Sequence, residues 1–277
     1  MRGSTLRKKT SYDLAPTVLN WIKNGVDIYD FLQPFKGSFK GENFNHDVPP
    51  SRQFDNNASC RGFESFVNDT IAEGLASGAI SVWGTVEQSE VPYLVMPLTV
   101  EPSKPRLCHD SRFLNLWIKD CPFKLDHLNM LTGYVKKNSW QTVCDDKSGY
   151  HHILLSPESR RFLGFQWSGV YYVYNTIPFG WKASAYIYHS TGLLVTNYFR
   201  SIFIPCLLYI DDRHTGELLV SSLTPAYAAL PPSQRPYARA EAASFIVCYT
   251  LIMQFGLFHW SSEIYPRPSS VRAIFGV

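Results

Sequence analysis

The sequence lacks several features that would assign it to a familiar class. Its six cysteines are scattered and form no C-x-x-C pair, which argues against a structural zinc site and against a small disulfide scaffold. The first fourteen residues contain no apolar run of the kind that a secretory signal needs. The most apolar stretch, residues 242–257, is shorter than the ~20 residues of a membrane-spanning helix. We therefore expect a soluble protein with free thiols, a reducing compartment and no membrane partner.

Charge is also scarce. Charged residues make up 18% of the chain and the formal net charge is +3, a balance that allows a nucleic-acid partner without demanding one. Hydrophobic residues make up 45% and aromatic residues 15%, so the chain has ample material for a core and little reason to be disordered. At 277 residues it can form one large domain or two modest ones.

The pattern of apolar residues predicts an α+β fold with an antiparallel sheet, because the predicted strand pairs adjoin one another along the chain. An apolar residue recurs every fourth position from Phe63 to Leu75, which predicts an amphipathic helix that ends near Gly78. The remaining elements that we expect are helical and extended fragments at 12–35, a surface loop at 41–59, strands or hairpins at 93–100, 106–115, 141–146, 162–174, 204–210 and 217–220, and helices at 181–198 and 238–255.

Two acidic pairs are the candidates for chemistry. The motif YIDD at 209–212 ends an apolar strand, and Asp145 and Asp146 end another. Adjacent carboxylates beside an apolar strand repel each other and are costly to desolvate unless a cation neutralises them. An ordinary acidic turn explains either pair taken alone. If the two strands lie side by side, Asp145 and Asp211 meet at one sheet edge and form an oxygen-only site that suits Mg²⁺.

Four motifs in order resemble those of reverse transcriptases. KPRLCHDSRFLN at 104–115 resembles the fingers motif K-x-R-x-x-x-D-x-R-x-L-N. DDKSGYHHI at 145–153 resembles motif A, IPFGWKASA at 177–185 resembles motif B, and YIDD resembles motif C. The continuation RHTGEL at 213–218 is similar to the reverse transcriptase of the DIRS-like, tyrosine-recombinase group of retrotransposons.

The resemblance implies the fingers and palm of a right-hand polymerase, with the palm an antiparallel sheet packed on helices. Residues 1–60 would form an N-terminal extension and the start of the fingers, 61–135 the fingers, and 136–277 the palm, with an interleaved fingers segment at about 155–180. The chain would stop near the final palm motif, so that the thumb, ribonuclease H and recombinase of a longer Pol polyprotein would be missing.

The resemblance also gives roles to single residues. Asp145, Asp211 and Asp212 would be catalytic and would hold two Mg²⁺ ions, with Mn²⁺ as a substitute. Arg106 would clamp the phosphates of the incoming nucleotide, because a guanidinium is always charged and offers paired donors. Tyr150 would lie under the nucleotide sugar and obstruct a 2′-hydroxyl, and plain packing is the alternative for this side chain.

Other positions carry supporting roles by the same resemblance. Asp110 and Arg112 are expected to pair with each other inside the fingers. Lys182 would help to hold the template backbone, and an ordinary solvated lysine is nearly as good an interpretation of this position. The remaining nucleotide-binding positions would be Asp146 through its backbone carbonyl, Phe179 and Gly180, and the template–primer positions would be Lys104 and Lys182.

The resemblance thus implies an RNA-directed DNA polymerase that adds deoxynucleoside triphosphates to a primer 3′-hydroxyl on an RNA or DNA template by two-metal-ion transfer. The alternative is a catalytically inactive retrotransposon remnant that only binds nucleic acid, and the missing thumb favours it. No lysine follows Lys182, so the family's palm lysine has no counterpart near WSSE at 260–263. A third class, another template-directed polymerase such as a group II intron enzyme, is disfavoured by the sequence that continues motif C.

Overall fold

The structure, a computed structural model, describes residues 11–133, 141–145, 148–201, 206–215 and 272–274. These residues form helices and mainly antiparallel strands, as expected of a mixed α and β fold. The chain divides into two compact units. The first unit comprises Met1–Leu19, Phe123–Gly149 and Tyr188–Val277, and the second comprises Asn20–Pro122 and Tyr150–Ile187.

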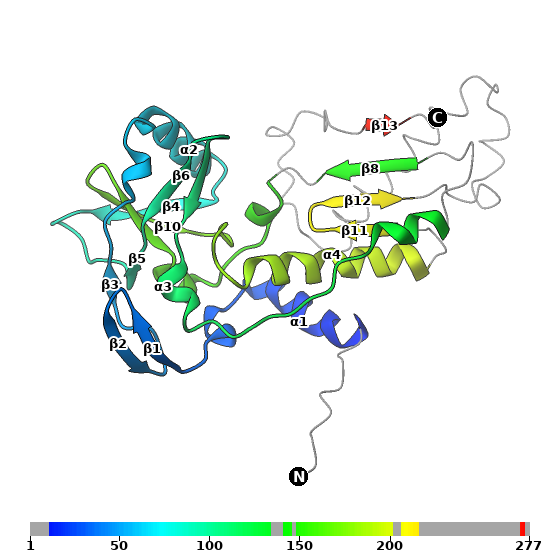
Figure 1. Cartoon of the computed structure of the whole chain (residues 1–277), viewed down its shortest axis with the longest axis horizontal. Helices are drawn as coiled ribbons and strands as arrows, with labels where there is room; N and C mark the ends of the chain where they lie inside the picture. Colours follow the sequence, from blue (N-terminus) through cyan, green and yellow to red (C-terminus); the bar gives the residue numbers. More distant parts are fainter. Residues whose placement is uncertain (1–10, 134–140, 146–147, 202–205, 216–271, 275–277) are drawn as a thin grey trace, which may run out of the picture. The chain divides into compact units, whose positions relative to one another are not determined.

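The first unit contains a four-stranded sheet in the order β11-β12-β8-β13, and each neighbouring pair is antiparallel (Figure 1). Its strands are β8 (Gln141–Asp145), β11 (Cys206–Tyr209), β12 (Asp212–Thr215) and β13 (Arg272–Ile274). The strands predicted at 141–146 and 204–210 are confirmed. Cys206, Leu207 and Leu208 of β11 are buried, which explains why this strand could be recognised from its apolar run.

The hairpin between β11 and β12 corrects one prediction. We expected Asp211 and Asp212 to form the turn and the return strand to run over 217–220. In the structure the turn is Ile210–Asp211, and Asp212 already pairs with Tyr209 as the first residue of β12. Polar residues in β12 hid its strand character from an apolar pattern. The predicted strand at 217–220, the helix at 238–255 and Asp146 lie outside the described residues.

Helix α4 (Ser184–Ser201) covers this sheet in the first unit through a close contact at Gly192. A methyl group on Gly192 would lie 2.8 Å from the Leu208 Cδ2 atom and 3.6 Å from an Arg213 terminal nitrogen. A larger residue at this position would therefore have to displace the Leu208 side chain for the helix to approach β11 this closely. The helix predicted at 181–198 is confirmed, shifted by three residues toward the C-terminus.

The second unit is built on a five-stranded sheet in the order β3-β5-β9-β10-β4. Helix α2 (Glu64–Ala76), which the fourfold spacing predicted, packs its Val67 and Ile71 side chains into one core with Phe165 of β9. The hairpin predicted at 162–174 is confirmed, with Gly169 in its turn. The strands are β3 (Arg52–Gln53), β4 (Ile80–Thr85), β5 (Leu94–Val95), β9 (Gly164–Trp167) and β10 (Val170–Tyr174).

A separate hairpin in the second unit joins β6 (Leu98–Glu101) to β7 (Arg106–His109). The strand predicted at 93–100 is divided into β5 and β6 around Pro97, which has no backbone N–H for a strand ladder. The strand predicted at 106–115 ends at His109, and the short helix α3 (Arg112–Asn115) follows it.

The surface loop predicted at 41–59 was wrong. Strands β1 (Phe35–Phe39) and β2 (Glu42–His46) form an antiparallel hairpin there, and β3 follows. Lys40 and Gly41 both have positive φ angles, 50° and 85°, which is the backbone of a two-residue hairpin turn. The polar sequence of β2 concealed the strand, because Phe44 is its one buried residue.

The remaining elements are short or lie near the N-terminus. None of the helices within the described residues is both long enough and apolar enough to cross a membrane. These elements are α1 (Ser11–Asn24) and the 3₁₀ helices η1 (Ile28–Phe31), η2 (Ala58–Cys60), η3 (Leu128–Gly133), η4 (Gly149–His152) and η5 (Pro157–Phe162).

Candidate functional site

The acidic residues of the first unit meet at one end of three neighbouring strands. Asp212 is the Cα partner of Asp145 across β12 and β8, and Asp211 stands in the adjoining turn. Asp211 and Asp212 are exposed. The side chain of Asp145 is not among those that the structure describes. The backbone register therefore brings together the three positions that the sequence predicted to share a sheet edge.

The turn that carries Asp211 has an unusual backbone. Ile210 has a φ angle of +54°, in the left-handed region, where β-branched side chains are rare. A conformation of this kind costs on the order of 1–3 kcal/mol and persists because the surrounding structure imposes it. Here the two-residue connection between paired strands imposes it, since such turns require a positive φ at their first residue. Strain is thus located beside the candidate carboxylates.

Asp126 supports the same hairpin, and no sequence pattern had pointed to this residue. Among the described residues, strand β11 is at the edge of its sheet, and one side of its backbone has no neighbouring strand there. The Asp126 carboxylate accepts a hydrogen bond of 2.9 Å from the Leu208 backbone N–H and pairs with Arg200 at 2.6 Å. Arg200 in turn donates to the Cys206 carbonyl oxygen at 2.8 and 2.9 Å. Two side chains thus bind the free edge of β11 and fix the hairpin.

Arg213 follows Asp212 but lies on the opposite, buried face of β12. It is 1% exposed, and its Nε and one terminal nitrogen have no hydrogen-bond partner among the described residues. The other terminal nitrogen is 3.5 Å from the Gly192 carbonyl oxygen. Removing a guanidinium from water costs free energy, so burial of Arg213 on the face of the sheet that α4 covers opposes folding.

In the second unit, Tyr150 and Phe179 form a stacked pair. Their ring centroids are 4.5 Å apart and the ring planes differ by 30°. Phe179 is 54% exposed and Tyr150 is half-buried, so the pair lies at the surface of this unit. The two residues were predicted to contact the same nucleotide, and here they contact each other.

Gly180 fits against the backbone of another motif. Its φ angle is +106°, and a methyl group there would lie 2.0 Å from the His109 carbonyl oxygen. Asn115 then binds both sides of the turn: its Nδ2 donates to the Gly180 carbonyl oxygen and its Oδ1 accepts from the Lys182 N–H, each at 2.8 Å. Asn115 belongs to the fingers-like motif, but the sequence assigned it no role. Only the fold reveals that it clamps a turn 65 residues away.

The predicted template–primer cations differ in their surroundings. The Lys182 ammonium donates to the Ile118 carbonyl oxygen at 2.9 Å and pairs with Asp120 at 2.6 Å. Lys104 lies in the turn of the β6–β7 hairpin and Arg106 is the first residue of β7, and both side chains are exposed. The charges of Lys104 and Arg106 are thus presented to solvent. The Lys182 ammonium is instead bound to Ile118 and Asp120, next to the turn that Asn115 holds.

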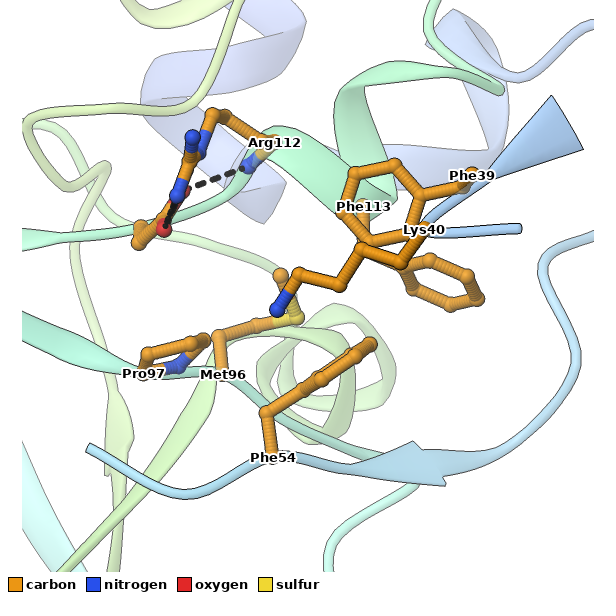
Figure 2. A pocket seen from close by; sticks show the side chains of 8 residues that line it. Phe39, Lys40, Phe54, Met96, Pro97, Arg112 and Phe113 are labelled. Carbon is orange, nitrogen blue, oxygen red and sulfur yellow. Dashed lines mark hydrogen bonds and ion pairs between the residues drawn. The ribbon is translucent and has the colours of Figure 1, made fainter. Parts of the chain in front are cut away.

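A small hollow in the second unit combines aromatic rings and cations (Figure 2). Phe39, Phe54 and Phe113 pack edge to face or tilted, with centroids 5.1–6.3 Å apart. The Lys40 ammonium lies 5.3 Å from the Phe54 ring centroid, within the range of a cation–π interaction. Arg112 stands at the rim and binds Asp110 at 2.6 Å, which confirms the predicted pairing of these two residues. The other residues that line the hollow are Met96 and Pro97.

His109 is the last residue of β7 and is 1% exposed. Burial lowers its pKa to about 4, although a hydrogen bond to the Gly164 carbonyl oxygen opposes the shift. Its other ring nitrogen lies 2.7 Å from the Ser111 hydroxyl oxygen. The ring is therefore neutral at physiological pH and acts as a packed structural group.

The donor set at the sheet edge fits the metal that the sequence predicted. Aspartates 145, 211 and 212 offer only carboxylate oxygens, which suit Mg²⁺ or Mn²⁺ and do not suit zinc or copper. Among the side chains that the structure describes, no three His, Cys, Asp or Glu residues come together as a metal site; the third carboxylate of this set, Asp145, is not one of them. Magnesium binding stays a prediction.

The candidate residues thus form two groups, each within its own unit. Asp145, Asp211 and Asp212 belong to the first unit. Asp146, predicted to bind nucleotide, belongs to the first unit and lies outside the described residues. The second unit holds the other residues predicted to bind nucleotide and template–primer, namely Lys104, Arg106, Tyr150, Phe179, Gly180 and Lys182. The catalytic and binding roles themselves stay predictions.

Comparison with known protein sequences finds relatives among polyproteins of viruses and a transposon. The chain is 28% identical over 154 residues to an enzymatic polyprotein of Cestrum yellow leaf curling virus, a match that covers 50% of this chain and 24% of that protein. It is 28% identical over 160 residues to the retrovirus-related Pol polyprotein from transposon gypsy of Drosophila melanogaster, which covers 54% and 15%. The chain therefore spans about a quarter or less of these relatives. No family model matches it.

Comparison with solved structures concerns the fold. The crystal structure of native prototype foamy virus protease–reverse transcriptase aligns with a TM-score of 0.51 at 16% identity, over 75% of this chain and 24% of that chain. A mutant of the same protein gives 0.52 at 17% identity, over 76% and 24%. The relatives of this chain are thus virus and transposon Pol polyproteins, which supports a retroelement Pol domain, and its fold resembles that of a retroviral protease–reverse transcriptase.

Proposed function

We propose that this chain is the fingers and palm of a reverse transcriptase from a DIRS-like retrotransposon, and that it is an RNA-directed DNA polymerase. The observation that carries the proposal is the strand register that makes Asp212 the partner of Asp145 with Asp211 in the adjoining turn. Three carboxylates at one sheet edge suit two Mg²⁺ ions, which would activate the primer hydroxyl and stabilise the charge that develops on the transferred phosphate.

The protein's own groups would bind and orient the substrates. Arg106 and Lys104, exposed on their hairpin, would bind phosphates of the nucleotide and of the template–primer. Tyr150 and Phe179 would contact the incoming deoxynucleoside triphosphate. The other domains of the Pol polyprotein would act with this one.

Primer extension tests the proposal. We expect the chain to extend a DNA primer on an RNA template with deoxynucleotides and Mg²⁺, and to stop when the metal is chelated. Asp211→Asn and Asp212→Asn should each reduce extension more than about 100-fold, because each removes a charge from the metal site. The matched control is Asp69→Asn, an exposed aspartate on α2, which should keep wild-type extension.

Two other outcomes would contradict the proposed site or the proposed activity. If the aspartate variants extend as well as wild type, the carboxylates are not the site. If no protein extends a primer while wild type still binds template–primer, the inactive remnant that only binds nucleic acid is the correct function. Phosphate binding predicts that affinity falls steeply with rising salt, and a flat response would exclude Lys104 and Arg106 as phosphate ligands.

A further inference from the structure

The stacked pair of Tyr150 and Phe179 is held by backbone hydrogen bonds between two antiparallel segments. The Leu155 N–H donates to the Asn175 carbonyl oxygen at 2.8 Å, and the Ile177 N–H donates to the Ile153 carbonyl oxygen at 3.0 Å. Tyr150 precedes the first segment and Phe179 follows the second, and the antiparallel pairing of Leu154 with Thr176 brings these two ends together. The two aromatic side chains therefore leave the same end of a short ladder, which accounts for their 4.5 Å contact.

The turn at Phe179 is fixed on every side by the second unit. The buried Ser184 hydroxyl donates to the Pro178 carbonyl oxygen at 2.7 Å, and Asn115 donates to the carbonyl oxygen of Gly180 at 2.8 Å. Gly180 itself has no room for a side chain against His109. The backbone of Phe179 is thus set by its neighbours on both sides, which places the attachment point of its ring beside Tyr150.

We propose that Phe179 is a positioning residue that holds the Tyr150 ring in place and thereby sets the preference for deoxynucleotides over ribonucleotides. This inference rests on the proposed polymerase function, in which Tyr150 lies under the nucleotide sugar. A side chain rejects an additional hydroxyl through a steric clash, and the clash is effective only if the side chain cannot move away. Stacking supplies that resistance, because a displaced Tyr150 would lose its contact with Phe179.

Single-nucleotide incorporation with dATP and with ATP measures the effect. We expect Phe179→Leu to lower the ratio of kcat/KM for dATP to kcat/KM for ATP by about two- to tenfold, the range of an aromatic pair interaction. Phe179→Tyr retains a ring for stacking and should restore the ratio. Trp83→Leu, which truncates a partly exposed aromatic ring on β4, is the matched control and should leave the ratio unchanged.

If Phe179 acted only through its own contact with the nucleotide, and not by holding the Tyr150 ring, the result would be different. In that case Phe179→Leu raises KM for dATP and ATP by the same factor and the ratio stays constant, which would overturn the inference. A double-mutant cycle further separates the positioning of Tyr150 from a direct effect of Phe179 on the nucleotide. In a Tyr150→Ala background the ring that Phe179 would position is absent. Phe179→Leu should then change the ratio less than about 1.5-fold, which is close to the error of such a measurement. Equal effects of Phe179→Leu in both backgrounds would overturn positioning.

Failure of this inference can be distinguished from failure of the proposed function. An active wild-type chain whose Phe179→Leu variant keeps the wild-type ratio overturns the positioning role and leaves the polymerase proposal intact. If wild type does not extend a primer, competition of dATP and ATP against a fluorescent deoxynucleotide gives the ratio of the two affinities, and Phe179→Leu should shift that ratio in the same direction. A wild-type chain that neither extends a primer nor binds the fluorescent deoxynucleotide overturns both.

Discussion

The two units hold their candidate residues in opposite ways. In the first unit, the positions of Asp211 and Asp212 follow from the strand register and from a two-residue turn. In the second unit, the positions of Phe179 and Gly180 follow from contacts with segments about 65 residues away in the sequence, through Asn115 and the His109 carbonyl oxygen. The turn that carries Asp211 is closed by the pairing of its own two strands, whereas the turn at Phe179 is held by segments distant in sequence.

This difference has consequences for mutational tolerance. A hairpin that needs a positive φ tolerates many side chains at moderate strain, because the turn residues face solvent. A glycine in contact with another backbone tolerates none, because neither backbone can move without disturbing its own hydrogen bonds. The second unit should therefore be the more sensitive of the two to single substitutions, and substitutions can test this from the largest effect to the smallest.

The largest effect is expected for Gly180→Ala. The added methyl group would lie 2.0 Å from the His109 carbonyl oxygen, and alanine disfavours a φ of +106°. Together these should lower the free energy of unfolding by about 4 kcal/mol or more. Urea denaturation followed by tryptophan fluorescence measures it.

Gly78→Ala is the matched control for that substitution. Gly78 also has a positive φ, +73°, but a methyl group there would meet no atom of the described part of the chain within 4 Å. We expect it to cost only about 1 kcal/mol, the backbone cost alone. Equal losses in the two variants would show that the contact with His109 is not limiting.

The next effect concerns the neutral His109 ring. Its pKa is about 4 in the folded protein and 6.5 when unfolded, so between these values the unfolded state binds more protons and stability falls as pH decreases. The loss attributable to His109 should reach about 2 kcal/mol at pH 5 relative to pH 7.

His109→Asn removes this titration while keeping a polar group near Ser111. Unfolding free energies at pH 7, 6 and 5 should therefore fall less steeply in the variant than in wild type. Burial also lowers the pKa of His151, His189 and His214, so the variant should retain part of the slope. Identical slopes in the two proteins would contradict a buried neutral His109.

A smaller effect is expected for Asn115→Ala. It leaves the Gly180 carbonyl oxygen and the Lys182 N–H without their side-chain partner, which should cost about 1–2 kcal/mol. Hydrogen exchange sharpens the test, because the Lys182 amide should exchange faster in the variant. Asn24→Ala removes an exposed bond between two helical asparagines and should cost less than about 0.5 kcal/mol. An unchanged Lys182 exchange rate would show that Asn115 does not hold the turn.

The sequence allowed the main elements to be predicted where periodicity was strong. Helix α2 has a fourfold apolar repeat, and β11 is an apolar run that ends in an acidic motif. Both signals arise from burial of one face, and burial is what the fold requires of these segments. Strand β2 gave no such signal, because it buries only Phe44. Its turn at Lys40 and Gly41 lacks the Asn-Gly pair that marks such hairpins most clearly.

The positions of the candidate residues were predictable to the same extent. The ordered motifs were enough to predict that Asp145 and Asp211 adjoin at one sheet edge, and the strand register agrees, while their catalytic role stays a prediction. Asn115 and Asp126 could not be found in this way, because each acts on backbone atoms that are distant in sequence. A side chain that binds a backbone N–H or carbonyl leaves no residue-type pattern at its partner, so only the tertiary structure shows the pair.

The smallest effect separates strain from function in the first unit. Ile210→Asn should raise the free energy of unfolding by about 0.5–1 kcal/mol, because asparagine tolerates the left-handed backbone that isoleucine disfavours. Ile210→Val keeps a β-branched side chain at φ +54° and should give no such gain. If the Asn variant is no more stable than the Val variant, the hairpin is not strained at Ile210. A more stable Asn variant would confirm that a side chain in this unit can be replaced with a gain, whereas the addition of one methyl group to Gly180 in the other unit is strongly destabilising.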